Sequence, residues 1–262
     1  MIINPYVFGV AFDPDAQAFI TAAGITDNTQ KSAINTLVLD MKGYGIWTKM
    51  KAIYPFVGGT ASTHKWNLKD PRDLDAAFRL VFFGGMTHSA NGILFAGVNG
   101  YANTNLNMST NYAVNNSTHI SFYSRTSAAL SASFEMGVFD GASIIGVTLR
   151  RSDFGFGTYY AVNSGAYISF TDSNAAAFYI SNRLGTAENG WRNSTKTATA
   201  TNTALTRPSL NMIIGAQNTG SLNQATTRQC AFATIGDGLT DTEAGNFYLA
   251  VQAFNTTLSR QV

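Results

Sequence analysis

Carboxylates are the side chains of this sequence that come nearest to a catalytic pair. The chain contains three glutamates, Glu135, Glu188 and Glu243. A glycoside hydrolase needs two carboxylates at a defined separation across a sugar. Hydrolases with a sandwich fold commonly carry them on one strand as Glu-x-Asp-x-x-Glu, whereas Glu135 is followed by Met-Gly-Val-Phe and then Asp140. Asp140 stays open as a spatial partner of Glu135, but we assign no catalytic residue.

Metal ligands are equally sparse. The three histidines, His64, His88 and His119, are scattered, and no two of them have the spacing of metal ligands on one element. The acidic run at 70–75 lacks the Asp-x-Asp-x-Asp-Gly order of a calcium loop. We expect this run to form a turn, and we expect neither a metal nor a cofactor.

Aromatic side chains are the better candidates for binding. Tyr and Trp rings present flat faces to sugar rings, and alternate members of a strand must face outward. We expect the contacts to a ligand at Trp191, Arg192 and Asn193, which we place in a loop between strands. Further polar candidates in nearby loops are Asn182, Arg183 and Asn189. Four tyrosines lie in or near expected strands: Tyr159, Tyr160, Tyr167 and Tyr179.

The composition describes a folded domain with few charges. Hydrophobic residues make up 45% of the chain, which is enough for a full core, and charged residues only 12%, about half the usual share. The net charge is +2 without a dense Lys/Arg cluster, so we expect no nucleic-acid binding. No segment reaches the roughly 18 apolar residues of a membrane span, so we expect no membrane insertion. The single Cys230 fits a buried strand position.

Short strands dominate the sequence after residue 55. Each is bounded by Gly, Asn, Asp or Ser, and no helical pattern separates them, which indicates an antiparallel sandwich or jelly roll. The segments 99–117 and 195–206 are rich in Asn or Thr, and we expect them to be long loops. The strands are expected at 78–82, 119–124, 133–139, 143–150, 158–162, 166–170, 177–181, 209–215 and 229–235.

Helices are expected at both ends of the chain. Asp13 with Pro14 starts one helix that ends at Gly24, and Asp27 caps a second helix that ends near Gly43. A third short helix is expected at 47–53. At the C-terminus, Thr240 and Glu243 form a capping box that opens a helix over 240–258. One face of that helix carries Ala244, Phe247, Tyr248, Val251, Phe254 and Leu258.

These elements divide the chain into three parts. Residues 1–12 are an apolar segment that we expect to dock onto a neighbouring protein. Residues 13–55 form a helical region, and residues 56–262 form a jelly-roll sandwich closed by the helix 240–258. The fold class is therefore mainly β, an antiparallel β-sandwich or jelly roll, with a small N-terminal helical region and a C-terminal helix.

Three stretches of the chain together resemble a known group of proteins. They are residues 13–59, beginning DPDAQAFITAAGITDN, residues 64–85, HKWNLKDPRDLDAAFRLVFFGG, and residues 228–262, beginning RQCAFATIGDGLTDTEAGNFYLA; NGYANTNLN at 99–107 is a weaker anchor. This set resembles tailed-phage virion proteins, frequent in phages of the Bacteroidetes, that carry a concanavalin-like (laminin-G-like) jelly roll behind a small helical region.

The resemblance implies a structural or adhesive virion component, often attached to a tail or baseplate, and supplies no catalytic residue. We therefore expect a non-enzymatic virion protein, associated with a tail or fibre, whose lectin-like domain adheres to host-surface glycan. A purely structural virion subunit, such as a capsid decoration or a collar or baseplate component, and a glycan depolymerase remain the alternatives. The partners would be other virion proteins, bound through residues 1–12, and further copies of the chain, most simply as a trimer. Such a protein would be assembled in the host cytoplasm and displayed extracellularly on the virion.

Overall fold

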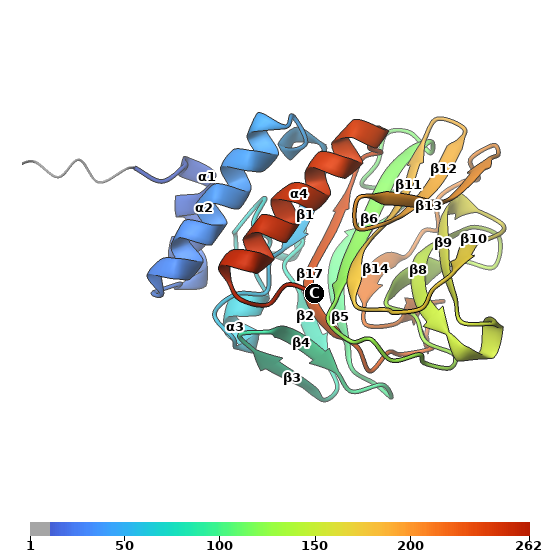
Figure 1. The fold of residues 1–262 in the computed structure, drawn as a ribbon, viewed down its shortest axis with the longest axis horizontal. Helices are drawn as coiled ribbons and strands as arrows, with labels where there is room; N and C mark the ends of the chain where they lie inside the picture. Colours follow the sequence, from blue (N-terminus) through green and yellow to red (C-terminus); the bar gives the residue numbers. More distant parts are fainter. Residues whose placement is uncertain (1–10) are drawn as a thin grey trace, which may run out of the picture.

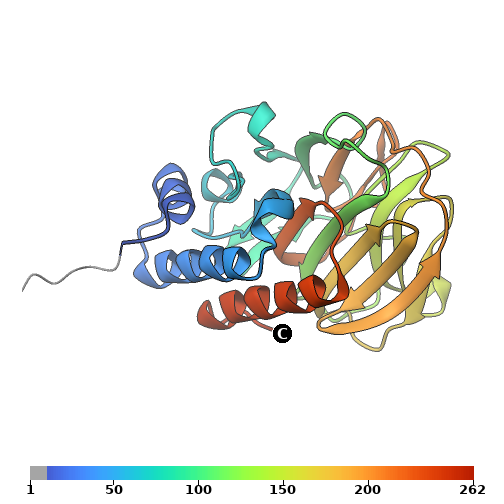
Figure 2. The ribbon, with the colours of Figure 1, turned by 90° about the horizontal axis from the view of Figure 1, so that it is seen from above.

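The computed structural model describes residues 11–262 as three layers, one of helices and two of strands (Figures 1 and 2). The helices are α1 (Pro14–Ala23), α2 (Asn28–Gly43), α3 (Ala61–His64) and α4 (Asp241–Thr257), with single 3-10 turns η1 (Trp47–Lys49), η2 (Asp75–Ala77) and η3 (Ser152–Phe154). Residues 1–10 of the expected docking segment lie outside the described residues. The prediction of a mainly β antiparallel sandwich with helices at both ends is confirmed.

An eight-stranded sheet forms the middle layer. Its spatial order is β13 (Thr195–Thr201), β12 (Ala187–Arg192), β11 (Ala177–Leu184), β6 (Ser117–Ser124), β17 (Gln229–Gly236), β4 (Gly92–Phe95) and β3 (Met86–Ser89), and β1 (Met50–Tyr54) also pairs with β17. The neighbouring strands in this sheet are antiparallel. The helices α2 and α4 run side by side over its outer face (Figure 1).

A nine-stranded sheet forms the far layer. Its spatial order is β10 (Ile168–Thr171), β9 (Gly157–Ser164), β8 (Ile144–Arg151), β7 (Met136–Phe139), β14 (Asn211–Ile214), β5 (Tyr101–Asn107) and β2 (Val81–Phe83). The short strands β15 (Gln217–Asn218) and β16 (Leu222–Asn223) form a hairpin at its outer face, and β15 runs parallel to β7. None of the described helices packs on that outer face as α2 and α4 do on the other sheet.

Two cores hold the layers together. One lies between the sheets and contains apolar side chains from alternate positions of strands in both, such as Ile120, Phe122, Val147 and Ile214. The other lies between the eight-stranded sheet and the helices. The central strands β6, β11 and β17 of the middle sheet are therefore buried on both faces, so their burial does not alternate along the strand.

The C-terminal helix forms as predicted. The backbone N–H of Thr240 donates to Glu243 Oε2 at 2.7 Å, and the N–H of Glu243 donates to Thr240 Oγ1 at 3.3 Å, which is the reciprocal capping box. Phe247, Val251 and Phe254 are buried against the eight-stranded sheet, and Leu258 is partly buried beside them. The predicted packing of this helix on the sandwich is confirmed.

Both N-terminal helices also begin where the sequence indicated. Asp13 Oδ1 accepts from the N–H of Asp15 at 3.0 Å, and Asp27 Oδ1 accepts from the N–H of Gln30 at 2.8 Å. Gly24 ends α1 with φ of +65°, a left-handed conformation that glycine adopts without steric cost.

The expected helix at 47–53 is wrong. Only Trp47–Lys49 turns, as η1, and the chain then enters β1, which pairs antiparallel with β17. Ala52 and Tyr54 face the core between the sheets while Ile53 faces the helices, so the segment has the alternation of a strand. Its partner lies far away in sequence, and pairing with that partner overrides the local helical pattern.

Two expected loops contain strands. The segment 99–117 contains β5, which pairs with β14 and β2, and the segment 195–206 contains β13, which pairs with β12. Two expected strands also start later than predicted. Phe78 adopts φ of +60° at the end of η2, so β2 starts at Val81, and β7 starts at Met136 rather than at residue 133. The expected strands that start near 119, 143, 158, 177 and 229 are confirmed as β6, β8, β9, β11 and β17.

Candidate functional site

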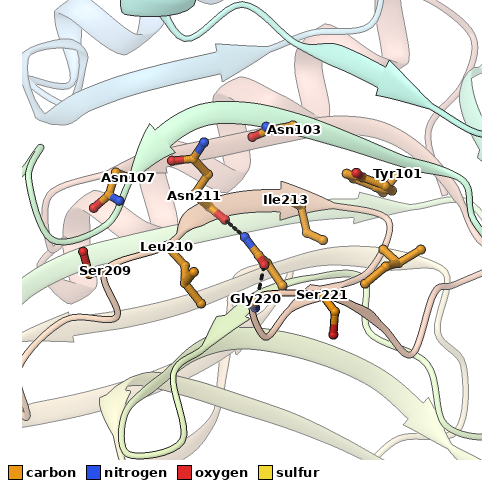
Figure 3. A pocket seen from close by; sticks show the side chains of 11 residues that line it. Tyr101, Asn103, Asn107, Ser209, Leu210, Asn211, Ile213, Gly220 and Ser221 are labelled. Atoms are coloured by element: carbon orange, nitrogen blue, oxygen red, sulfur yellow. Dashed lines mark hydrogen bonds between the residues drawn. The ribbon is translucent and has the colours of Figure 1, made fainter.

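A groove of about 380 Å³ lies on the outer face of the nine-stranded sheet (Figure 3). Its floor is made by β5 and β14, and one wall is the hairpin of β15 and β16. The lining side chains come from three segments: Tyr101, Asn103 and Asn107; Ser209, Leu210, Asn211 and Ile213; Asn218, Gly220, Ser221 and Leu222. Amides and hydroxyls therefore surround a small apolar floor.

The strand β5 supplies the amides through its alternation. Ala102, Thr104 and Leu106 are buried, whereas the residues between them face outward and are half-buried. Asn103 lies opposite Ile213 and Asn107 lies opposite Asn211 across the ladder with β14. Side chains at directly opposed positions lie on one face, so the two strands bring their amides together.

The hairpin is fixed beside the groove by Asn218. Its Nδ2 donates to the carbonyl oxygen of Asn211 at 2.9 Å, and its Oδ1 accepts from the N–H of Gly220 at 3.0 Å, as the dashed lines in Figure 3 mark. The Asn218 amide is thus engaged in holding the hairpin in place. The other amides of the groove are the ones that a ligand could contact.

Several polar groups of the groove have no protein partner. Asn103 Oδ1 accepts from the N–H of Asn105, and Asn107 Oδ1 accepts from the N–H of Ser109. No hydrogen bond within residues 11–262 engages the Nδ2 of either residue or the side-chain amide of Asn211. The two free Nδ2 groups can donate, and the Asn211 amide can both donate and accept, which matches the hydroxyl groups of a sugar.

An aromatic pair borders the groove at the edge of the sheet. Phe83 of β2 lies opposite Tyr101 of β5, and their rings stack with centroids 4.9 Å apart and planes 11° apart. Phe83 is 42% exposed, a high value for a phenylalanine ring. The pair forms a flat apolar platform at the end of the row of amides, and an apolar surface with a few convergent polar groups is typical of small-ligand sites.

The groove is electrically neutral and holds no carboxylate. Of the described residues that line it, none carries a charge. Glu135 lies buried with Arg228, whose Nε donates to Glu135 Oε1 at 2.8 Å, and Glu188 lies buried with Arg183 at 3.0 Å. Asp140 is exposed in a turn, where its Oδ1 accepts from the N–H of Ser143 at 2.9 Å. The structure does not bring Glu135 and Asp140 together as an acid–base pair.

The histidines and the acidic run have local structural contacts. His64 and His88 lie with their Nδ1 atoms 3.0 Å apart, and the Nδ1–H of His119 donates to the carbonyl oxygen of Asp237 at 2.6 Å. The carboxylates of Asp70, Asp73 and Asp75 pair with Arg72, Lys65 and Arg79 in the expected turn. In residues 11–262, no three His, Cys, Asp or Glu side chains are grouped to hold a metal ion.

The predicted ligand contacts lie elsewhere, at the end of β12. Trp191 and Arg192 are in that strand, so their expected place in a loop is wrong, and Asn193 occupies the turn to β13 with φ of +55°. The Trp191 side chain is 2% exposed in the core beneath the helices, which leaves no ring face for a sugar. Arg192 Nη2 donates to the carbonyl oxygen of Asn174 at 2.9 Å, and Asn193 Oδ1 accepts from the N–H of Phe178 at 3.0 Å.

The other polar candidates are structural as well. Asn182 holds the turn before α4, because its Oδ1 accepts from the N–H of Leu239 at 2.7 Å. Asn189 Oδ1 accepts from the hydroxyl of Thr199 at 2.8 Å. Tyr160 and Tyr179 are buried between the sheets, whereas Tyr159 and Tyr167 reach the outer face of the nine-stranded sheet.

Sequence reasoning missed the groove because it treated 99–117 as a loop. One signal for it was present: apolar or small residues alternate with Tyr and Asn through Tyr101–Asn107, which is the period of a half-buried strand. Of the partner segments, 209–215 was expected to be a strand and contains β14, but no local signal places it beside β5. Their position depends on pairing between distant parts of the chain.

No protein-family model matches the chain, and no curated protein matches it. No described helix has the length and apolar character needed to cross a membrane. Among solved structures, the chain is similar to domain 4 of an extracellular GH43 arabinanase from Geobacillus stearothermophilus in complex with arabinotriose. The identity is 10%, the TM-score is 0.54, and the match covers 76% of this chain and 98% of that domain.

A second similar structure is a mutant of Trypanosoma rangeli sialidase that displays trans-sialidase activity. The identity is 9%, the TM-score is 0.56, and the match covers 84% of this chain but 39% of that chain. Identities this low show a shared fold and carry no residue across. The chain therefore shares a jelly-roll-like β-sandwich fold with these structures.

Proposed function

We propose that this protein is a non-enzymatic carbohydrate-binding protein and that the groove between β5 and β14 holds a neutral saccharide. The observation that carries the proposal is the row of amides on Asn103, Asn107 and Asn211 beside the stacked pair Phe83–Tyr101. Within residues 11–262, the Nδ2 groups of all three and the Oδ1 of Asn211 make no hydrogen bond. Sugars present hydroxyl groups around an apolar ring face. The amides of this surface can bind the hydroxyl groups, and the aromatic pair can pack against the apolar face. A charged ligand would find no counter-ion there.

The fold supports the proposal without deciding it. The GH43 arabinanase domain with a similar fold is described in complex with arabinotriose, which is a neutral saccharide. The lining of the groove supports a non-enzymatic role, because none of the carboxylates described above lines it and glycoside hydrolysis needs two.

We further propose that the protein acts on a phage virion, as the sequence resemblance implies, and adheres there to host-surface glycan from a tail or fibre. It would attach to other virion proteins through residues 1–12. A trimer would fit this role, because a shallow polar site binds one saccharide weakly and several linked sites raise the avidity by orders of magnitude. Light scattering of the purified protein at micromolar concentration tests the trimer, and a monomer contradicts it.

Binding is tested with a glycan array, followed by calorimetric titration of the oligosaccharides that score. We expect Asn211→Ala to weaken binding about tenfold, because one or two hydrogen bonds of roughly 1 kcal/mol each are lost. Tyr101→Ala should weaken binding at least as much. Asn91→Ala is the matched control, since Asn91 is an exposed asparagine in the turn between β3 and β4. It should bind like the unmodified protein.

Three results would each contradict a part of the proposal. Binding unaffected by Asn211→Ala and Tyr101→Ala places the saccharide elsewhere. No binding of any glycan by the oligomer favours a purely structural virion subunit. Release of reducing sugar from a host polysaccharide would instead favour a glycan depolymerase and contradict the non-enzymatic role.

A further inference from the structure

A second cavity lies on the same outer face, over β8 and β9. It has a volume of about 160 Å³ and is lined by Thr148, Arg151, Phe154, Tyr159 and Tyr167. Thr148 lies directly opposite Tyr159 across the ladder between the two strands, so both side chains face outward. A further hollow of about 340 Å³ shares Arg151 and Tyr167 with it, so the two lie side by side.

Exposed aromatic rings form the walls of this second cavity. Phe154 is 57% exposed and Tyr167 is 42% exposed. Tyr159 contacts both rings edge to face, with centroids 6.0 Å from Phe154 and 6.1 Å from Tyr167. The Tyr159 hydroxyl donates to the backbone carbonyl oxygen of Phe154 at 2.8 Å, and this hydrogen bond fixes the orientation of the Tyr159 ring. A cluster of oriented, solvent-facing rings is a usual mark of a binding surface.

The one cation of the cavity is neutralised. Arg151 Nε and Nη2 donate to the two carboxylate oxygens of Asp153, at 3.1 Å and 2.5 Å, and its Nη1 donates to Gln224 Oε1 at 2.9 Å. The hydrogen bond from Arg151 lowers the pKa of Asp153 to about 2, so this pair stays ionised and balanced at neutral pH. An acidic ligand therefore gains no free counter-ion here, and a neutral one is favoured.

The hairpin of β15 and β16 is a wall shared by both sites. Asn218, Ser221 and Leu222 face the groove, whereas Gln217 and Asn223, paired with each other across the same hairpin, line the second hollow. Gln224 follows the hairpin on that side. The second site thus repeats the chemistry of the first, with aromatic rings on one wall and amides on the other.

We propose that the aromatic cavity at Tyr159 and Tyr167 is a second saccharide subsite, and that one neutral oligosaccharide chain crosses the hairpin to occupy both subsites. The inference rests on the proposed function of the groove and extends it. The hairpin alone spans roughly 5 Å from strand to strand, and its side chains add to that width. The natural ligand is therefore an oligosaccharide or polysaccharide, and a single sugar or a disaccharide fills one subsite.

A length series of oligosaccharides tests the inference. The probes are size-fractionated neutral oligosaccharides, from disaccharide to octasaccharide, of the type that scores on the array. We expect affinity to rise at least about tenfold once the chain is long enough to cross the hairpin, because a second contact becomes intramolecular. Tyr167→Ala and Phe154→Ala should each abolish that rise. The affinity of each variant for the disaccharide should stay within about twofold of the value for the unmodified protein, well below a tenfold change, which corresponds to about 1.4 kcal/mol.

Tyr44→Ala is the matched control, because Tyr44 is a partly exposed tyrosine at the end of α2, in the helical layer. It should keep the full length dependence. Ring signals of Tyr159 and Tyr167 in NMR should shift with the octasaccharide and not with the disaccharide. Binding with no length dependence, or with Tyr167→Ala and Phe154→Ala both unchanged, overturns this inference alone. No binding by any length overturns the proposed function as well.

Discussion

Replacing Glu135 with alanine should destabilise the protein by about 3–5 kcal/mol, the cost of leaving a buried ion without its partner. Both side chains of the pair Glu135–Arg228 are fully buried, at 0% exposure. Arg228 also donates to the carbonyl oxygens of Thr126, Ala128 and Leu149, so its guanidinium cannot leave the interior without breaking several hydrogen bonds. A loss of this size is a large fraction of the roughly 5–15 kcal/mol that stabilises a domain.

The assay is denaturant unfolding followed by circular dichroism, with the free energy of unfolding extrapolated to water. Asp70→Ala is the control, because the pair Asp70–Arg72 lies at the surface and should contribute about 1 kcal/mol or less. Replacing both Glu135 and Arg228 with methionine should restore much of the stability, since no unpaired charge remains.

The same experiment bears on function. A catalytic glutamate can be replaced with little loss of stability, whereas a structural one cannot. The expected cost of Glu135→Ala is roughly 3–5 kcal/mol in the free energy of unfolding. If the free energy of unfolding of this variant lies within about 1 kcal/mol of the value for the unmodified protein, the structural interpretation of Glu135 is refuted. A glycan-cleaving activity that is lost in Glu135→Gln while the stability stays unchanged would refute it equally.

Two further predictions concern stability. Phe247→Ala should cost about 3–5 kcal/mol in denaturant unfolding, because the ring is fully buried against Phe178 and Phe232, whereas Leu249→Ala, on the same helix and 53% exposed, should cost less than about 1 kcal/mol. Burial lowers the pKa of His119 from 6.5 to about 4. The unfolded chain therefore binds a proton at His119 near pH 6.5, whereas the folded chain binds it only near pH 4. The free energy of unfolding should keep its full value above pH 7 and fall by up to about 3 kcal/mol toward pH 4. His119→Gln should flatten that slope, and an unchanged slope contradicts the assignment.

The sequence predicted the elements whose causes are local. The helix α4 starts at Thr240 because a capping box needs only residues three positions apart, and its buried face repeats at helical spacing. The same holds for the starts of α1 and α2. Each of these signals is complete within a few residues, so no knowledge of the rest of the fold is needed to read it.

Elements that depend on distant partners were missed. The strand β1 exists because Ala52 and Tyr54 face the inter-sheet core while the backbone pairs with β17, at the other end of the chain. The strand β5 is built largely from Asn and small residues, which have low β-propensity, so its ladder partners β14 and β2 decide its conformation. The strand β13 is different, because it is rich in Thr, which favours strands, and pairs with its sequence neighbour β12, so its signal was local and was overlooked.

The site was misplaced for a related reason. Trp191 was expected to offer a ring face to a ligand because a strand of a sandwich has one outward side. In the eight-stranded sheet, however, both sides are inward, because α2 and α4 cover the face that a bare sandwich would expose, and Trp191 packs beneath them. The sequence contained both the helix and the tryptophan, but not the fact that one lies over the other.

The placement of the helices also explains why the binding surface belongs on the opposite layer. A sheet covered by helices gains stability from apolar burial and has no room there for a ligand, whereas the nine-stranded sheet keeps an outer face that must remain soluble with few charges. Asn103, Asn107 and Asn211 meet that need with amides, and in the described part of the protein their Nδ2 groups and the Oδ1 of Asn211 make no hydrogen bond. An uncharged surface with unused amides and oriented rings has the chemistry of a neutral saccharide's partner. The distribution of the helices, more than any single motif, therefore directs the search for a ligand to the outer face of β5, β14, β8 and β9.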